Sequence, residues 1–272
     1  MRVLACQIKI PAISSKADQR QHIDSLIQKL TIQLENNTVD LVLLPELSTL
    51  EYSVNNFENI DTYSEELLGE TFQIFSDVCK KYNTAISYGM PRRDQGRHYI
   101  SHITLDKSGT YLTHYDKIHT AQYGDAAEVN YFDRGNHLSV FELEGIKIGV
   151  VICYDIRFPE LIRRLCMECE VDLILHPVAF AQDLSFHSWQ QFVVSRALEN
   201  QVYFMSINQS GAHFGHSIIC PPWVDDETKP ISFGEEEEFK VITVSKDVID
   251  AVRVDIPYRK DTLTNYNILP VR

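Results

Sequence analysis

The segment that most constrains the fold is residues 147–161, KIGVVICYDIRFPEL, where an apolar run leads into a polar turn and then a helical pattern. Residues 148–152 are rich in β-branched side chains and are interrupted only by Gly149, which is typical of a strand buried on both faces. Cys153 stands where this run ends, and Pro159 opens the helical pattern because proline is favoured in a first helical turn. The segment therefore predicts an α/β protein with Cys153 at a strand-to-helix turn.

A cysteine in such a turn can serve as a nucleophile. Backbone N–H groups and the positive end of a helix dipole stabilise an anion there, so we expect the thiolate of Cys153 to be favoured. The alternative is that Cys153 is a small residue of the hydrophobic core. Its polar neighbours Tyr154, Asp155, Arg157 and Glu160 favour the functional interpretation.

Two other predicted strands end next to charged residues. Residues 3–8 and 39–44 are apolar runs separated by a helical pattern, and this order predicts a right-handed βαβ layer. The second run stops at Pro45, which leaves Glu46 at the carboxyl end of a strand, where ligands bind in open α/β sheets. Lys117 follows the second arm of a predicted hairpin in the same way. Each of these two charges could instead be a solvated surface group.

Length and composition bound the remaining possibilities. The chain has 272 residues and a formal net charge of −13, which argues against binding to nucleic acid or to anionic membrane surfaces. Six unevenly spaced cysteines do not suggest a disulfide scaffold, and no apolar run reaches the length of a transmembrane span. We expect a soluble cytoplasmic protein with one domain over residues 1–272. Residues 51–64 look like a surface loop, and we expect the polar tail at about 257–272 to pack on a partner subunit.

Glu46, Lys117 and Cys153 form a set that is sufficient for acyl transfer. A carboxylate can take the thiol proton and return it to a leaving amine. A nearby ammonium can stabilise the negative charge of a tetrahedral intermediate, and the backbone N–H of Tyr154 could be a second oxyanion donor. None of the ten histidines stands at a comparable strand end beside a polar turn, so we expect the base to be a carboxylate.

The motifs around these residues resemble the nitrilase, or carbon–nitrogen hydrolase, superfamily. The matching segments are LLPELS around Glu46, YDKIH around Lys117 and GVVICYDIRFPEL around Cys153. Later segments within 196–223 and 256–261 follow in the expected order, so the resemblance covers almost the whole chain. It implies a four-layer α-β-β-α sandwich, a homodimer or higher homo-oligomer, and no metal or cofactor.

The resemblance also implies a role for each site residue. Cys153 is then the nucleophile, Glu46 the general base and Lys117 the oxyanion stabiliser. Glu128, seven residues before Gly135, fits the second glutamate of the family, which orients the lysine and the substrate amide. The implied reaction is hydrolysis of a small-molecule amide through a thioester intermediate.

The sequence after the cysteine, CYDIRFPE, resembles the omega-amidase branch, which acts on amides of dicarboxylates. We expect Tyr52 and Phe180 to line the substrate pocket. Arg157 could bind a substrate carboxylate, or it could make an internal ion pair with Asp155 or Glu160.

Other interpretations stay open beside the omega-amidase one. An N-carbamoyl amidohydrolase is the main alternative within the fold, a nitrilase is a further one, and a catalytically weak interaction protein is an alternative of another class. Residues 181–185, AQDLS, depart from the threonine- and glycine-containing loop of the omega-amidase branch, and we expect this loop to border the pocket. The pair Cys166 and Cys169 falls late in a predicted helix without a second ligand pair, so we predict no metal there.

Overall fold

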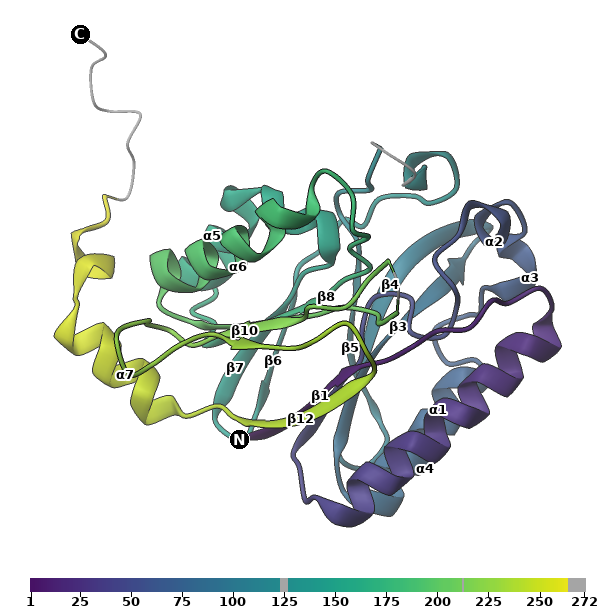
Figure 1. Ribbon diagram of the computed structural model, residues 1–272, viewed down its shortest axis with the longest axis horizontal. Helices are drawn as coiled ribbons and strands as arrows, with labels where there is room; N and C mark the ends of the chain where they lie inside the picture. The colour runs from purple at the N-terminus through teal and green to yellow at the C-terminus, as the bar shows by residue number, and fades with distance from the viewer. Residues whose placement is uncertain (123–126, 212, 264–272) are drawn as a thin grey trace, which may run out of the picture.

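Two six-stranded sheets face each other at the centre of the molecule, and helices cover the outer face of each sheet (Figure 1). The computed structural model describes residues 1–122, 127–211 and 213–263. The arrangement is the four-layer α-β-β-α sandwich that the sequence predicted.

The first sheet combines the N-terminal part of the chain with one strand that returns from the C-terminal part. Its strands, in spatial order, are β12 (Glu238–Thr243), β1 (Arg2–Gln7), β2 (Leu41–Leu43), β3 (Ala85–Asp94), β4 (Arg97–Leu105) and β5 (Tyr111–Asp116). β1, β2 and β3 are parallel, and the other pairings are antiparallel. Helices α1 (Lys16–Asn36) and α4 (Glu70–Tyr82) lie along the outer face of this sheet (Figure 1).

The second sheet is built from the later part of the chain. Its strands, in spatial order, are β11 (Ile231–Ser232), β10 (Ile218–Cys220), β9 (Tyr203–Ile207), β8 (Leu173–Pro177), β7 (Ile146–Val150) and β6 (Ser139–Leu143). β7, β8 and β9 are parallel, so their carboxyl ends meet at one edge. Helices α5 (Pro159–Met167) and α6 (Phe186–Asn200) cover its outer face, on the side of the molecule opposite α1 and α4 (Figure 1).

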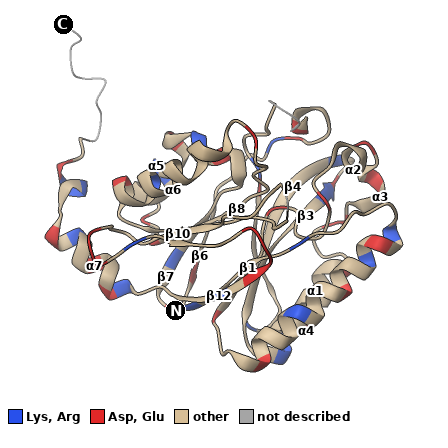
Figure 2. Ribbon diagram, viewed as in Figure 1, with Lys and Arg blue, Asp and Glu red and all other residues tan. Residues whose placement is uncertain are grey.

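The continuous apolar runs of the sequence are explained by strands with two buried faces. In β1, Val3 and Ala5 belong to the core that both sheets share, whereas Leu4 and Cys6 pack in the core beneath α1 and α4. Alternate residues of a strand point to opposite faces, so a strand covered on both sides shows no polar alternation. The solvent-facing helices differ: acidic and basic residues are interspersed along α1 (Figure 2).

Residues 51–64 are not the surface loop that we expected. They contain two short helices, α2 (Val54–Glu58) and α3 (Ile60–Tyr63). Phe57 of α2 is 1% exposed, and its ring centroid lies 5.0 Å from those of Tyr52 and Phe132. Contacts with a segment far along the chain thus bury a stretch whose polar composition suggests exposure.

The C-terminal part of the described chain packs on its own helices. After α7 (Lys246–Asp255) comes a 3₁₀ turn, η3 (Tyr258–Asp261), in which Arg259 donates a hydrogen bond of 3.1 Å to the carbonyl of Asn200 in α6. Arg163 of α5 donates to the Thr262 hydroxyl at 2.8 Å. The rest of the predicted tail, 264–272, lies outside the described residues. Within the described ranges, no helix combines the length and the apolar character needed to cross a membrane.

Candidate active site

Glu46, Lys117 and Cys153 meet between the two sheets. Glu46 follows β2 and Lys117 follows β5 in the first sheet, whereas Cys153 follows β7 in the second. The Nζ atom of Lys117 lies 2.8 Å from Oε1 of Glu46, and both side chains have no exposed surface. The Cys153 thiol is 8% exposed and lies close enough to Glu46 for the charge of this carboxylate to add to burial in raising the pKa of the thiol. The structure therefore brings together the three residues that the strand-end argument selected.

Glu128 joins this cluster from the other side of the lysine. Its Oε1 atom lies 2.8 Å from Nζ of Lys117 and also accepts the hydroxyl of Tyr52. Its Oε2 atom accepts the Ala121 N–H at 2.7 Å. Glu128 begins a 3₁₀ turn, η1 (Glu128–Asn130), and is fully buried. One ammonium therefore bridges two buried carboxylates, which is the arrangement that makes burial of such charges tolerable.

Gly135 explains why the loop after Glu128 returns to Lys117. The Gly135 N–H donates to the Lys117 carbonyl at 2.9 Å, so the turn lies against the end of β5. A Cβ atom at this position would collide with the carbonyl oxygen of Asp116. Only glycine allows the backbones to approach so closely. The turn thereby places Glu128 and Lys117 side by side.

Burial and charge shift the proton affinities of the cluster. Burial raises the pKa of Glu46 to about 7, against the opposing effect of the Lys117 ammonium. Burial opposes the charge of Lys117, but the carboxylates of Glu128 and Glu46 outweigh it and raise the pKa of this lysine. A base with a pKa close to neutrality, next to a lysine that stays charged, is suited to proton transfer at physiological pH.

The expectation of a favoured thiolate at Cys153 is wrong for the resting site. Burial, followed by the charge of Glu46, raises the pKa of the thiol well above its usual value. Cys153 opens a 3₁₀ turn, η2 (Cys153–Arg157), and α5 begins only after it, so the helix dipole that we invoked starts too far along the chain. The thiol must therefore lose its proton to a base, and Glu46 is the carboxylate whose charge acts most strongly on it.

Neighbouring segments of both sheets pack closely against the backbone and side chain of Glu46. A Cβ atom on Gly89 of β3 would lie 2.6 Å from the Pro45 carbonyl oxygen and 2.5 Å from the Leu47 nitrogen. The Ala179 N–H donates to Oε2 of Glu46 at 2.9 Å, and Gln209 donates to the Glu46 carbonyl at 3.0 Å. Glu46 is thus fixed by a neighbouring strand of its own sheet and by two loops of the other sheet.

A histidine that the sequence analysis did not select supports the backbone of Cys153. His176 lies in β8, where its Nε2 atom is 2.9 Å from the Cys153 carbonyl oxygen, and its Nδ1 atom is 2.8 Å from the Ser206 hydroxyl. A carbonyl only accepts, so Nε2 carries the proton. Burial lowers the pKa of His176 to about 4, which keeps the ring neutral. His176 lies inside β8 and not beside a polar turn, and it contacts the backbone of Cys153 and not its thiol.

A cavity of about 460 Å³ opens over Cys153. Four other predicted residues line it with Cys153, namely Tyr52, Glu128, Tyr154 and Phe180. Residues of the loop 181–185 also border it, as the sequence suggested. Phe180 is held by stacking on Trp189, with ring centroids 5.2 Å apart. The cavity therefore gives a small molecule access to the thiol, while Glu46 and Lys117 lie beneath its floor.

Arg157 is placed beside this cavity and not in its wall. Its guanidinium lies 5.4–6.0 Å from the ring centroids of Phe192, Phe180 and Tyr154. The Asp155 carboxylate, one of its predicted ion-pair partners, accepts hydrogen bonds from the Tyr115 hydroxyl at 2.8 Å and from the His119 N–H at 3.0 Å. Arg157 is not among the described residues that line the cavity, although two of these three rings do line it, so both predicted roles of Arg157 stay predictions.

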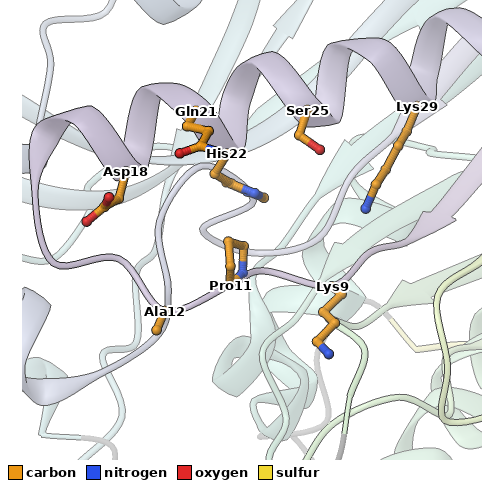
Figure 3. Close-up of a pocket in the computed structure, with 8 residues that line it drawn as sticks. All are labelled: Lys9, Pro11, Ala12, Asp18, Gln21, His22, Ser25 and Lys29. Atoms are coloured by element: carbon orange, nitrogen blue, oxygen red, sulfur yellow. The ribbon is translucent and has the colours of Figure 1, made fainter.

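Two other places in the described structure have features of a binding site. A cavity of about 350 Å³ lies between the start of α1 and residues 9–12 (Figure 3), but none of the predicted site residues lines it, and Lys29 at its edge is paired with Glu237 at 2.7 Å. His114, Asp116 and His137 offer possible metal-ligand atoms within 4.8 Å of one another. The Arg92 guanidinium, 2.7 Å from Asp116, competes for that carboxylate, so we assign no metal there.

Comparison with known proteins agrees with this architecture. The family model for carbon–nitrogen hydrolases matches residues 2–252. An omega-amidase from Xenopus tropicalis is 29% identical over 244 residues, covering 85% of this chain and 86% of the relative. A deaminated glutathione amidase from Dictyostelium discoideum is 27% identical over 293 residues, covering 96% of this chain and 94% of the relative.

Solved structures share the fold at lower identity. Nit3 of Saccharomyces cerevisiae, a member of branch 10 of the nitrilase superfamily, superposes with a TM-score of 0.81 at 22% identity, covering 99% of this chain and 97% of that one. An amidase from Nesterenkonia sp. AN1, in which acrylamide has added to the active-site cysteine, superposes with a TM-score of 0.74 at 20% identity. The match covers 96% of this chain and 99% of that one.

Proposed function

The chain belongs to the carbon–nitrogen hydrolase family, and we propose that it is an amidase that hydrolyses a small linear carboxylic amide and releases ammonia. The observation that carries this proposal is the position of Lys117, whose ammonium lies 2.8 Å from both Glu46 and Glu128 beside the Cys153 thiol. A nucleophile, a base and a fixed cation at the end of one cavity are the parts that acyl transfer needs.

In the first step, Glu46 takes the proton of the Cys153 thiol as the sulfur attacks the amide carbon. The C=O electron pair moves to oxygen, and Lys117 and the N–H of Tyr154 stabilise the oxyanion. The oxyanion then collapses, the C–N bond breaks, and Glu46 returns the proton to the departing nitrogen. The products are ammonia and a thioester on Cys153.

In the second step, water hydrolyses the thioester. Glu46 takes a proton from the water as its oxygen attacks the carbonyl carbon, and the same donors stabilise the second oxyanion. The C–S bond breaks, the sulfur leaves, and the proton on Glu46 returns to it. Glu128 orients Lys117 through both steps, and Tyr52 orients Glu128. The chemistry uses only groups of this chain and needs no cofactor.

The sequence resemblance favours the monoamide of a dicarboxylate as the substrate, as in the omega-amidases. An N-carbamoyl amine or amino acid would react by the same steps and is the main alternative. A catalytically weak interaction protein is the alternative of another class. The buried cluster of Glu46, Lys117 and Glu128 argues against an interaction protein, because burying these charges costs free energy that only a catalytic function would require.

The test measures ammonia release from a panel of amides, carbamoyl compounds and one nitrile by the wild-type protein. Cys153→Ala should abolish the release, whereas Cys169→Ala, a partly exposed cysteine outside the cavity, should retain it. Intact-mass detection of an acyl adduct on Cys153 would identify the thioester. An inactive wild-type protein, with Cys153 alkylated no faster than a free thiol, would instead support the interaction protein.

A further inference from the structure

The wall of the catalytic cavity carries negative charge. Its charged side chains are Glu51, Glu128 and Asp183, and no Lys or Arg is among the described residues that line it. We propose, on the basis of the proposed amidase function and in place of the dicarboxylate monoamide that the sequence resemblance favours, that the substrate carries an ammonium group at the end remote from the scissile amide.

Glu51 is the better placed of the two carboxylates that the catalytic cluster does not use. It is half-buried at the cavity wall, and its Oε2 atom accepts hydrogen bonds from the Ile13 N–H at 3.1 Å and the Asn56 amide at 3.3 Å. These bonds hold the carboxylate in place before any ligand arrives. A preorganised, partly desolvated charge attracts a cation more strongly than a mobile surface charge does.

Asp183 places a second carboxylate at the mouth of the cavity. Its Oδ1 atom accepts both the N–H and the hydroxyl of Ser185 at 2.7 Å, just before α6 begins. Asp183 is exposed, so solvent screens its attraction more than that of Glu51. Its main effect should be to guide a cationic substrate to the entrance.

Aromatic rings complete a surface suited to an ammonium group. Tyr52, Tyr154, Phe180 and Phe214 line the same cavity, and the faces of aromatic rings attract cations. The buried Lys117 is already paired with Glu46 and Glu128, and the Arg157 guanidinium lies 5.8–6.0 Å from the ring centroids of Phe180 and Tyr154 without lining the cavity. A substrate carboxylate would meet like charge on the wall without a lining cation to offset it.

Three amides of similar length and different charge test this inference. They are 5-aminopentanamide (cationic), pentanamide (neutral) and glutaramate (anionic). Turnover is measured by ammonia release at pH 8, where a histidine side chain of ordinary pKa is neutral. We expect kcat/KM to fall in the order cationic, neutral, anionic. We expect the advantage of the cationic amide over the neutral one to shrink when the salt concentration rises.

Two isosteric variants locate the recognition. Glu51→Gln keeps an acceptor for Ile13, and Asp183→Asn keeps one for Ser185. Each variant should lower the ratio of kcat/KM for the cationic amide to kcat/KM for the neutral amide by about fivefold. Asp77→Asn on α4, where the side chain is 82% exposed and far from the cavity wall, should leave this ratio as it is.

The outcomes separate this inference from the proposed function. Turnover of glutaramate in preference to the other two, lost in Cys153→Ala, would overturn the cationic substrate and keep the amidase. Equal turnover of all three, with no effect of Glu51→Gln on the ratio, would also overturn it. Absence of Cys153-dependent turnover of any amide would overturn the proposed function itself.

Discussion

The Nε2 atom of His176 lies 2.9 Å from the carbonyl oxygen of Cys153, so a neutral imidazole holds the backbone of the candidate nucleophile. Trp189 donates to the Ser206 hydroxyl at 2.8 Å, and this hydroxyl is in turn 2.8 Å from Nδ1 of His176. Cys153 has a φ of +46°, a conformation that costs energy for any residue except glycine. The buried chain of hydrogen bonds helps to keep the cysteine in that conformation.

We expect His176 to make the fold sensitive to acid. Its pKa is lowered from 6.5 to about 4 by burial, so the unfolded chain binds more protons than the folded one between these values. The free energy of unfolding should therefore fall by about 3 kcal/mol as the pH drops through this window.

The measurement for His176 is urea unfolding of the wild-type protein and of His176→Gln from pH 7 to pH 4. Glu46, whose pKa is raised from 4.5 to about 7, contributes with the opposite sign between those values in both proteins, so the difference between them is the quantity to follow. The variant, which retains a donor for the Cys153 carbonyl, should lose less stability than wild type on acidification. Parallel pH curves would contradict the prediction.

Activity should depend on the deprotonated form of Glu46. Because burial raises the pKa of this carboxyl to about 7, kcat/KM should rise through neutral pH and fall about tenfold for each unit below the apparent pKa. Glu46→Gln should lower kcat by about 10²- to 10⁴-fold at every pH and remove this limb of the profile. A wild-type plateau that extends below pH 6 would show that another group is the base.

Lys117 should be required for stability as well as for catalysis. Lys117→Met leaves Glu46 and Glu128 buried without their counter-ion, which should lower the free energy of unfolding by about 3–5 kcal/mol. Adding Glu46→Gln and Glu128→Gln should restore part of the loss, since the uncompensated charges are then removed. Lys80→Met, on the exposed face of α4, provides the control in urea titrations. A Lys117→Met protein as stable as wild type would refute this electrostatic account.

The close approach of β3 to the turn around Glu46 should make Gly89 essential. In Gly89→Ala, the new methyl group would lie 2.6 Å from the Pro45 carbonyl oxygen, so the backbone that carries Glu46 must move. We expect kcat to fall about 100-fold, the typical effect of a catalytic group displaced by about 1 Å. At Gly234 no atom lies within 4 Å of an added Cβ, so Gly234→Ala is the matched control. Similar kcat values for the two variants would argue against this account.

The three residues that meet between the sheets could be predicted because their signals are local. Each of Glu46, Lys117 and Cys153 follows a strand that the apolar pattern reveals, and strand ends are where α/β proteins place their ligand contacts. The layered fold followed from the same buried strands together with the family resemblance. Short segments around the three residues contain this information, so no long-range contact had to be known.

The sequence by itself therefore determined the family, the order of most strands and helices, and the residues brought to the strand ends. Only the tertiary structure decided the burial of 51–64, the support of Cys153 by His176, the protonated resting thiol and the acidic cavity wall. Each of these depends on contacts between segments far apart in the chain. Burial, close approach and the field of neighbouring charges arise only when those segments pack together, so a local pattern cannot report them.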